Sequence, residues 1–145
     1  MKITNLQGLI SPLPELAAQS CYLPRDKIFR VTELIGPPMI RRQLMDKWDY
    51  VSTDVEEYLP ALLGTAWHKF LADYPLDGVE QEPRLEIEIE GCKITGGLDW
   101  YLRSACWLND WKTASTWSWT FGRTDWESQL NIYAELLRTS GKPVT

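Results

Sequence analysis

Apolar and polar residues change their spacing twice along this chain, and each change marks a different kind of element. Over residues 52–74 the apolar positions recur every three or four residues, which predicts a helix. Over residues 84–90 they alternate with charged residues, which predicts a strand with one face in water. Helical spacing returns over residues 124–141. A helix, then strands, then a second helix predict an α/β domain of the α+β kind.

Capping signals set the expected start of the first long helix. Ser52 or Thr53 can cap it, and Glu56, three residues after Thr53, can complete a capping box. Pro60 and Gly64 predict a break or kink inside the helix, because proline lacks the backbone donor and glycine has a poor helix propensity.

The last helix carries clearer signals at both ends. Thr124 can cap it, with Glu127 three residues later, and Gly141 can end it. Shorter helices are expected over residues 14–20 and Pro38–Lys47.

The chain therefore divides into two parts within one domain. Residues 1–50 are expected to form an N-terminal helical extension. Residues 51–145 are expected to form the core.

Three strands are expected between the long helices, over residues 84–90, 93–102 and 105–113. Short connections join them, so they should pair as an antiparallel meander. Residues 142–145 resemble the start of a further strand that is cut short. We therefore expect a truncated C-terminal strand, with the open sheet edge completed by a partner or by a second copy of the chain.

Two aspartates and a lysine are predicted to meet on the last two strands. If residues 104–105 form the turn, Asp99 faces Asp110, and opposite residues of a ladder have Cβ atoms about 4.5–5.5 Å apart. Lys112 should project from the same face as Asp110, whereas Trp111 should point into the core. Two carboxylates this close repel each other unless a cation lies between them, and Mg²⁺ or Mn²⁺ suits such oxygen ligands.

Each candidate residue also has a purely structural interpretation. Lys112 can form a cross-strand ion pair with either aspartate. His68 is the only histidine, and a lone histidine on a helix more often has a structural or surface role. Gln129 and Tyr133 are four residues apart and share a helix face, a spacing that carries no chemical meaning by itself.

Composition narrows the class of protein without assigning an activity. A formal net charge of −5 over 145 residues argues against a surface that holds nucleic acid by bulk electrostatics, although a metal site can itself collect carboxylates. The apolar runs are too short to cross a bilayer and the N-terminus lacks a signal-peptide core, which predicts a cytoplasmic protein with no membrane partner. Three widely spaced cysteines predict buried, reduced thiols. The eight tryptophans fit core packing or stacking platforms for bases.

Four short motifs follow one another between about residues 55 and 138: GTAWHKFL, GGLDWYL, NDWKTAS and QLNIYAELL. In this order and spacing they resemble the RecB-like branch of the PD-(D/E)xK nuclease superfamily, which includes lambda-type phage exonucleases. The segment TELIGPPMIRRQL is similar to an N-terminal segment common in phage members. The resemblance implies a restriction-endonuclease-like core, in which a helix, a three-stranded antiparallel meander and a second helix follow an N-terminal extension.

The resemblance also implies the members of a metal site. Asp99 and Asp110 would bind Mg²⁺ or Mn²⁺, with His68 and the backbone carbonyl of Trp111 completing the ligand set. Lys112 would position the attacking water and stabilise the charge that develops on the phosphate.

Other residues would line the catalytic site or contact the substrate. Gln129 and Tyr133 would line the site and would either contact the substrate phosphate or order Lys112, and Thr113 would contact the substrate. Glu82 or Glu86 would correspond to an acidic position found in some members.

The implied activity is metal-dependent hydrolysis of DNA phosphodiester bonds by an exonuclease of phage or prophage recombination or of DNA repair, in the host cytoplasm if phage-encoded. The motifs are also compatible with RNA, with endonucleolytic cleavage and with either polarity. An alternative is a catalytically weak nucleic-acid-binding or assembly module that retains the fold. The four-cysteine signature of some relatives is absent, so no iron–sulfur cluster is expected. Lambda-type relatives form rings, which implies a homo-oligomer of unspecified size.

Overall fold

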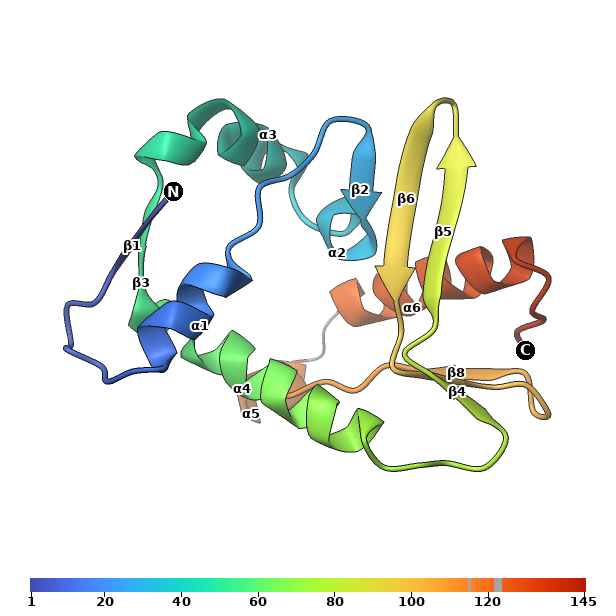
Figure 1. Cartoon of the computed structure of the whole chain (residues 1–145). Coiled ribbons are helices and arrows are strands. Elements are labelled where there is room, and N and C mark those ends of the chain that lie inside the picture. Colours follow the sequence, from blue (N-terminus) through green and yellow to red (C-terminus); the bar gives the residue numbers. More distant parts are fainter. Residues whose placement is uncertain (115, 122–123) are drawn as a thin grey trace.

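A computed structural model describes residues 1–114, 116–121 and 124–145 as a mixed α/β fold with three small sheets (Figure 1). The helices are α1 (Leu13–Ser20), α2 (Val31–Leu34), α3 (Pro38–Lys47), the 3₁₀ helix η1 (Trp48–Tyr50), α4 (Val55–Ala72), α5 (Thr116–Phe121) and α6 (Thr124–Thr139). The strands are β1 (Lys2–Thr4), β2 (Ile28–Arg30), β3 (Ser52–Asp54), β4 (Val79–Gln81), β5 (Arg84–Ile89), β6 (Cys92–Gly97), β7 (Trp100–Leu102) and β8 (Trp107–Asn109).

The predicted antiparallel meander is present between α4 and α6, but it is bent. Strands β4 and β5 form its first arm, β6 and β7 its second, and β8 its third. The pairs Gln81–Trp100 and Arg84–Gly97 keep one register across the bend, and Glu82 N donates to Asp99 O at 2.7 Å. The expected single sheet is wrong, because β5 and β6 lie in one sheet and β4, β7 and β8 lie in another. Pro83 stands at the break, where it has no N–H to extend the ladder.

Helix α4 is continuous, so the expected break at Pro60 or Gly64 is wrong. The predicted cap is also wrong, because Asp54 rather than Ser52 or Thr53 caps the helix: its Oδ1 accepts from Glu56 N at 3.2 Å. Glu57, not Glu56, completes the capping box. Gly64 serves packing, since a Cβ built there would lie 3.2 Å from Thr113 Oγ1.

Helices α3 and α6 agree closely with the sequence. The prediction of Pro38–Lys47 is confirmed. Thr124 is the first residue of α6 rather than its cap, and the residue before it lies outside the described part of the chain. Gly141 ends the helix with φ of 81°, and Lys142 N donates back to Leu137 O at 2.9 Å.

The N-terminal extension contributes strands as well as helices. Strand β2 pairs in parallel with β6 and so joins the sheet of the core, and β1 pairs in parallel with β3. A parallel partner for β6 was not predicted, because a three-residue strand leaves almost no periodic signal.

The last residues do not form the expected strand. They fold back on the β7–β8 hairpin instead, where Tyr101 Oη donates to Pro143 O at 2.6 Å and Thr145 N donates to Cys106 O at 3.2 Å. Val144 packs against the core. The side chain of Tyr101 is fully buried, so this contact anchors the segment.

Two expectations from composition bear on the described residues. Every helix described here is too short or too polar to cross a lipid bilayer. The three thiols, Cys21, Cys92 and Cys106, are free, but they are half-buried rather than buried as expected.

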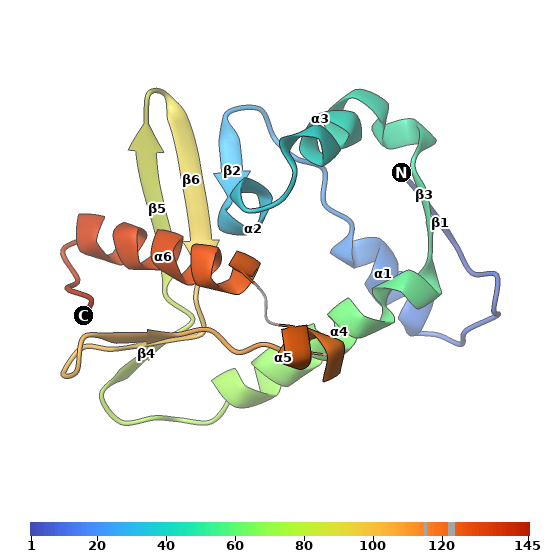
Figure 2. The same ribbon diagram turned by 180° about the vertical axis from the view of Figure 1, so that it is seen from behind.

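The core lies between α6 and the sheet formed by β2, β6 and β5, where α6 covers one face (Figure 2). Leu85 and Leu98 pack there with Leu137 and Tyr133. Gly96 makes this packing possible, because a Cβ built on it would lie 2.6 Å from Tyr133 Cε1 and 2.9 Å from Val31 Cγ2.

Replacing Gly96 with alanine is therefore expected to lower the free energy of unfolding by about 1–3 kcal/mol, the usual cost of overpacking. Gly97→Ala is a matched control, because no atom lies within 4 Å of a Cβ built there. Urea unfolding followed by tryptophan fluorescence measures both variants. Equal losses would show that the contact with Tyr133 does not constrain this position.

Candidate functional site

The bend of the meander brings Asp99 against helix α4 and against the end of β8. Nδ1 of His68, in the last turns of α4, lies 2.6 Å from Asp99 Oδ1. The other oxygen, Oδ2, accepts a hydrogen bond from the backbone N–H of Trp111. Both carboxylate oxygens of Asp99 are therefore engaged, one by a side chain and one by the backbone.

The predicted register of the second hairpin is confirmed. Leu102 pairs with Trp107, and the ladder continues to Trp100 and Asn109. Asp99 and Asp110 are the next residues beyond that last pair, at the mouth of the hairpin.

Asp110 is buried and forms an ion pair with Lys112. Its side chain is 6% exposed, whereas that of Lys112 is 28% exposed. Burial raises the pKa of the Asp110 carboxyl group above its ordinary value of 3.8, and the negative charge of Asp99 acts in the same direction. The Lys112 ammonium and His68 oppose this shift without cancelling it. The fold thus holds a carboxylate where its charge is costly.

Gln129 and Tyr133 lie on the buried face of α6 and bond to each other. Gln129 Nε2 donates to Tyr133 Oη at 2.9 Å, and both side chains are almost fully buried. Burial raises the pKa of Tyr133, the Gln129 hydrogen bond lowers it, and the charges of Asp110 and Asp99 raise it further. The phenol therefore lies within electrostatic reach of both acids.

The remaining sequence-predicted residues lie around this centre. Thr113 is exposed and packs on α4 at Gly64. Trp111 was expected in the core, but its side chain is 39% exposed, so that prediction is wrong. The backbone N–H of Glu82 donates to Asp99 O. Glu86 instead bonds to Lys93 at 3.1 Å, on the exposed face of the β5–β6 hairpin.

In the described residues, no group of three or more His, Cys, Asp or Glu side chains is arranged to hold a metal ion. His68 and Asp99 contact each other directly, and Lys112 forms an ion pair with the Asp110 carboxylate. The donor chemistry nevertheless suits a hard divalent cation, because two carboxylates and an imidazole lie in one neighbourhood. A cation would have to replace the internal partners of the two aspartates.

An apolar cavity of about 390 Å³ adjoins this cluster, and sequence reasoning missed it. His68 and Asp99 line one side, and the aromatic side chains of Tyr74, Trp100 and Trp111 line much of the rest. The two tryptophans flanking the acidic positions were the available signal.

Comparisons with known proteins identify a fold and no family. No family model matches this chain, and no curated protein matches it. The crystal structure of SSO0001 is similar, with a TM-score of 0.67 and 24% sequence identity over 91% of this chain and 68% of that one. At this identity the similarity shows a shared α/β architecture alone.

The raised pKa of Asp110 predicts how the metal-free protein responds to pH. The pKa of Asp110 in the folded state lies above its ordinary value of 3.8. In the pH range between these two pKa values the folded state therefore binds more protons than the unfolded state. The stability contributed by Asp110 falls as pH rises through this range. Asp110→Asn removes the buried charge. The variant should therefore be at least as stable as wild type at pH 7. As pH falls toward 4, the free energy of unfolding of wild type should rise relative to that of the variant.

Urea unfolding of both proteins across this pH range tests the prediction, with Asp77→Asn at an exposed position as the matched control. The opposite trend, with a wild-type advantage at pH 7 that disappears in acid, would show that the Lys112 ion pair outweighs burial.

Proposed function

We propose that this chain is a divalent-metal-dependent nuclease that hydrolyses phosphodiester bonds in DNA. The observation that supports the proposal is the meeting of His68, Asp99, Asp110 and Lys112, which come from α4, the bend and the end of β8. A buried, partly neutralised carboxylate contributes little to stability, so its presence beside a second carboxylate and an imidazole favours a chemical role.

The residues that would hold a cation are Asp99, Asp110, His68 and the Trp111 backbone carbonyl. A bound Mg²⁺ or Mn²⁺ would polarise the scissile phosphate and lower the pKa of a coordinated water. Imidazole is a better ligand for Mn²⁺ than for Mg²⁺, so His68 favours the former. In the metal-free protein Asp99 holds this imidazole through Nδ1, a contact that a cation would replace.

Lys112 and Tyr133 would contact the substrate from different elements of the site. Lys112 keeps an ammonium group at the site, and its partial exposure leaves it accessible to a phosphate. A fixed positive charge there would stabilise the negative charge that develops on the phosphoryl oxygens. Gln129 fixes the Tyr133 hydroxyl group, which would contact the substrate from α6.

A second candidate is a nucleic-acid-binding or assembly module that retains the fold without turnover. The observation that favours it is that both acids already have internal partners: His68 for Asp99, and Lys112 for Asp110. If these contacts persist in the presence of divalent cations, the cluster is structural.

A cleavage assay separates the two candidates. End-labelled linear duplex DNA is expected to be degraded in Mn²⁺ or Mg²⁺ and to survive in EDTA. Asp110→Asn should abolish cleavage and weaken Mn²⁺ binding severely in calorimetry, while the exposed Asp77→Asn should match wild type. Parallel circular DNA and RNA substrates distinguish exonuclease from endonuclease action and DNA from RNA. Mn²⁺ binding by Asp110→Asn equal to wild type would leave Asp110 as an ion-pair partner only.

Lys112→Ala is expected to keep Mn²⁺ binding but to reduce turnover by about 10²–10³, the typical cost of removing one electrostatic group from a transition state. Lys47→Ala removes an exposed lysine at the end of α3 and serves as the control. Single-turnover cleavage and calorimetry measure the two quantities separately. Cleavage within a few-fold of wild type would make Lys112 structural.

A further inference from the structure

An open groove of about 930 Å³ runs along the face of the β2–β6–β5 sheet. Side chains alternate along these strands, so Leu85 and Ile94 face the core under α6. Their neighbours along the strands line this basic groove, which includes Arg25, Arg30, Arg84, Lys93, Thr95 and Gly97. The core residues Leu85, Gly96 and Tyr133 border the groove as well.

The groove concentrates positive charge in a chain whose formal net charge is −5. Four basic side chains line it against a single carboxylate, Glu86, whose partner is Lys93 at 3.1 Å. Across the described ranges, Arg25, Arg30 and Arg84 have no carboxylate within ion-pairing distance. Three unneutralised guanidinium groups on one concave surface are the electrostatic pattern of a polyanion site.

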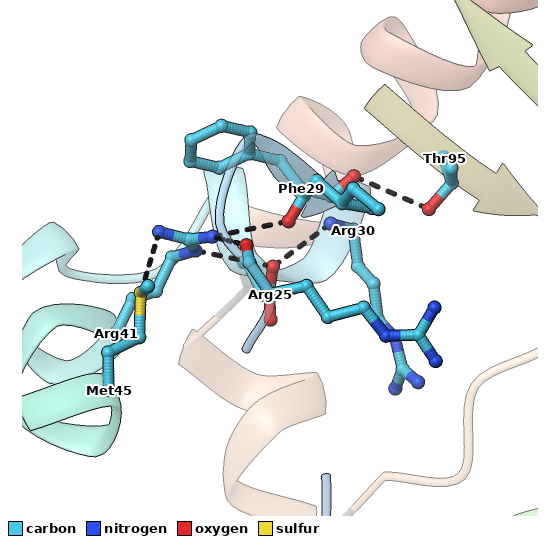
Figure 3. A network of polar contacts seen from close by, with 8 residues as sticks. Arg25, Phe29, Arg30, Arg41, Met45 and Thr95 are labelled. Atoms are coloured by element: carbon cyan, nitrogen blue, oxygen red, sulfur yellow. Dashed lines mark hydrogen bonds and ion pairs between the residues drawn. The ribbon is translucent and has the colours of Figure 1, made fainter. Parts of the chain in front are cut away.

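A half-buried arginine on α3 holds one wall of this groove in place. Arg41 donates to Arg25 O and Ile28 O, lies 4.1 Å over the Phe29 ring, and pairs with Glu33 at 3.5 Å. In Figure 3, Arg25 and Arg30 extend away from Arg41, to the opposite side of the loop.

A contact within the groove also fixes one of its arginine side chains. The Arg30 guanidinium stacks on Tyr22, 3.2 Å from the ring centroid. Strand β2 is joined to β6 by its ladder and by Thr95, which donates to Phe29 O at 3.4 Å. This order is established before any ligand arrives, which lowers the entropic cost of binding.

One end of the groove adjoins the candidate catalytic cluster. Gly97 and Tyr133 both line the groove. Gly97 is two residues from Asp99, and Tyr133 lies within the electrostatic influence of Asp99 and Asp110. A ligand lying along β6 would therefore reach the acids at the bend.

We propose that the basic groove binds the phosphodiester backbone of a single-stranded nucleic acid and leads it to the His68–Asp99 end of the meander. The inference rests on the proposed function for the identity of its ligand. A single strand fits because the groove lies on one small sheet, no atom lies within 4 Å of a Cβ built on Gly97, and the stacked Arg30–Tyr22 pair offers a flat surface to a base.

The test is binding without cleavage. A fluorescein-labelled oligothymidylate is titrated in EDTA with wild type, with the double variant Arg30→Ala/Arg84→Ala, and with the control Arg42→Ala/Arg138→Ala. The control removes the same charge from exposed arginines whose partners are Asp46 and Glu135. Fluorescence anisotropy is measured at several salt concentrations, and a duplex of the same length is titrated in parallel.

The groove variant is expected to bind about tenfold or more weakly than wild type, with a salt slope shallower by about 1.4, since each lost phosphate contact on a single strand contributes about 0.7. The control should keep the wild-type slope. Equal losses in both variants, an unchanged slope in the groove variant, or tighter binding of the duplex through the same arginines would overturn the proposal. Binding is measured in EDTA and tests the groove, whereas metal-dependent cleavage tests the proposed nuclease function. Failure of one measurement can therefore be distinguished from failure of the other.

Discussion

Asp99 ties together three parts of the chain that are distant in sequence. Its Oδ1 contacts His68 of α4, its Oδ2 accepts from the Trp111 backbone after β8, and its carbonyl oxygen accepts from Glu82 in the first arm of the meander. These three contacts meet where the ribbon bends between its two sheets. The position of His68 and α4 against the hairpins, next to Asp110 and Lys112, depends on these contacts of Asp99.

Elements with a long periodic pattern were predictable from the sequence, and those fixed by tertiary contact were not. The bounds of α3, the end of α6 at Gly141 and the pairing of Leu102 with Trp107 follow from local signals. The continuity of α4 through Pro60 does not, because neighbouring elements outweigh a local penalty of this size. The bend was not predictable either, because it depends on Pro83 and on the hydrogen bond from Glu82 N to Asp99 O, a residue distant in sequence.

The candidate site shows a similar division. Hairpin register was enough to bring Asp99 and Asp110 together, and helical spacing was enough to pair Gln129 with Tyr133. The ion pair of Asp110 with Lys112 was anticipated as the structural alternative. The contact of Asp99 with His68 did not follow from residue spacing, because it depends on how α4 lies against the bend. The basic groove was missed for a related reason: its arginines are scattered along the sequence and converge only when β2 joins β6.

The pairing of β2 with β6 has a kinetic consequence. The two strands are far apart in sequence, and closing a long loop costs entropy before any contact repays it. The β5–β6 hairpin is local and can form first, which leaves β6 with an open edge until the N-terminal segment arrives. During refolding the hairpin would thus form before the segment with Arg25 and Arg30 docks against it, and the basic groove would be completed only in the last stage of folding.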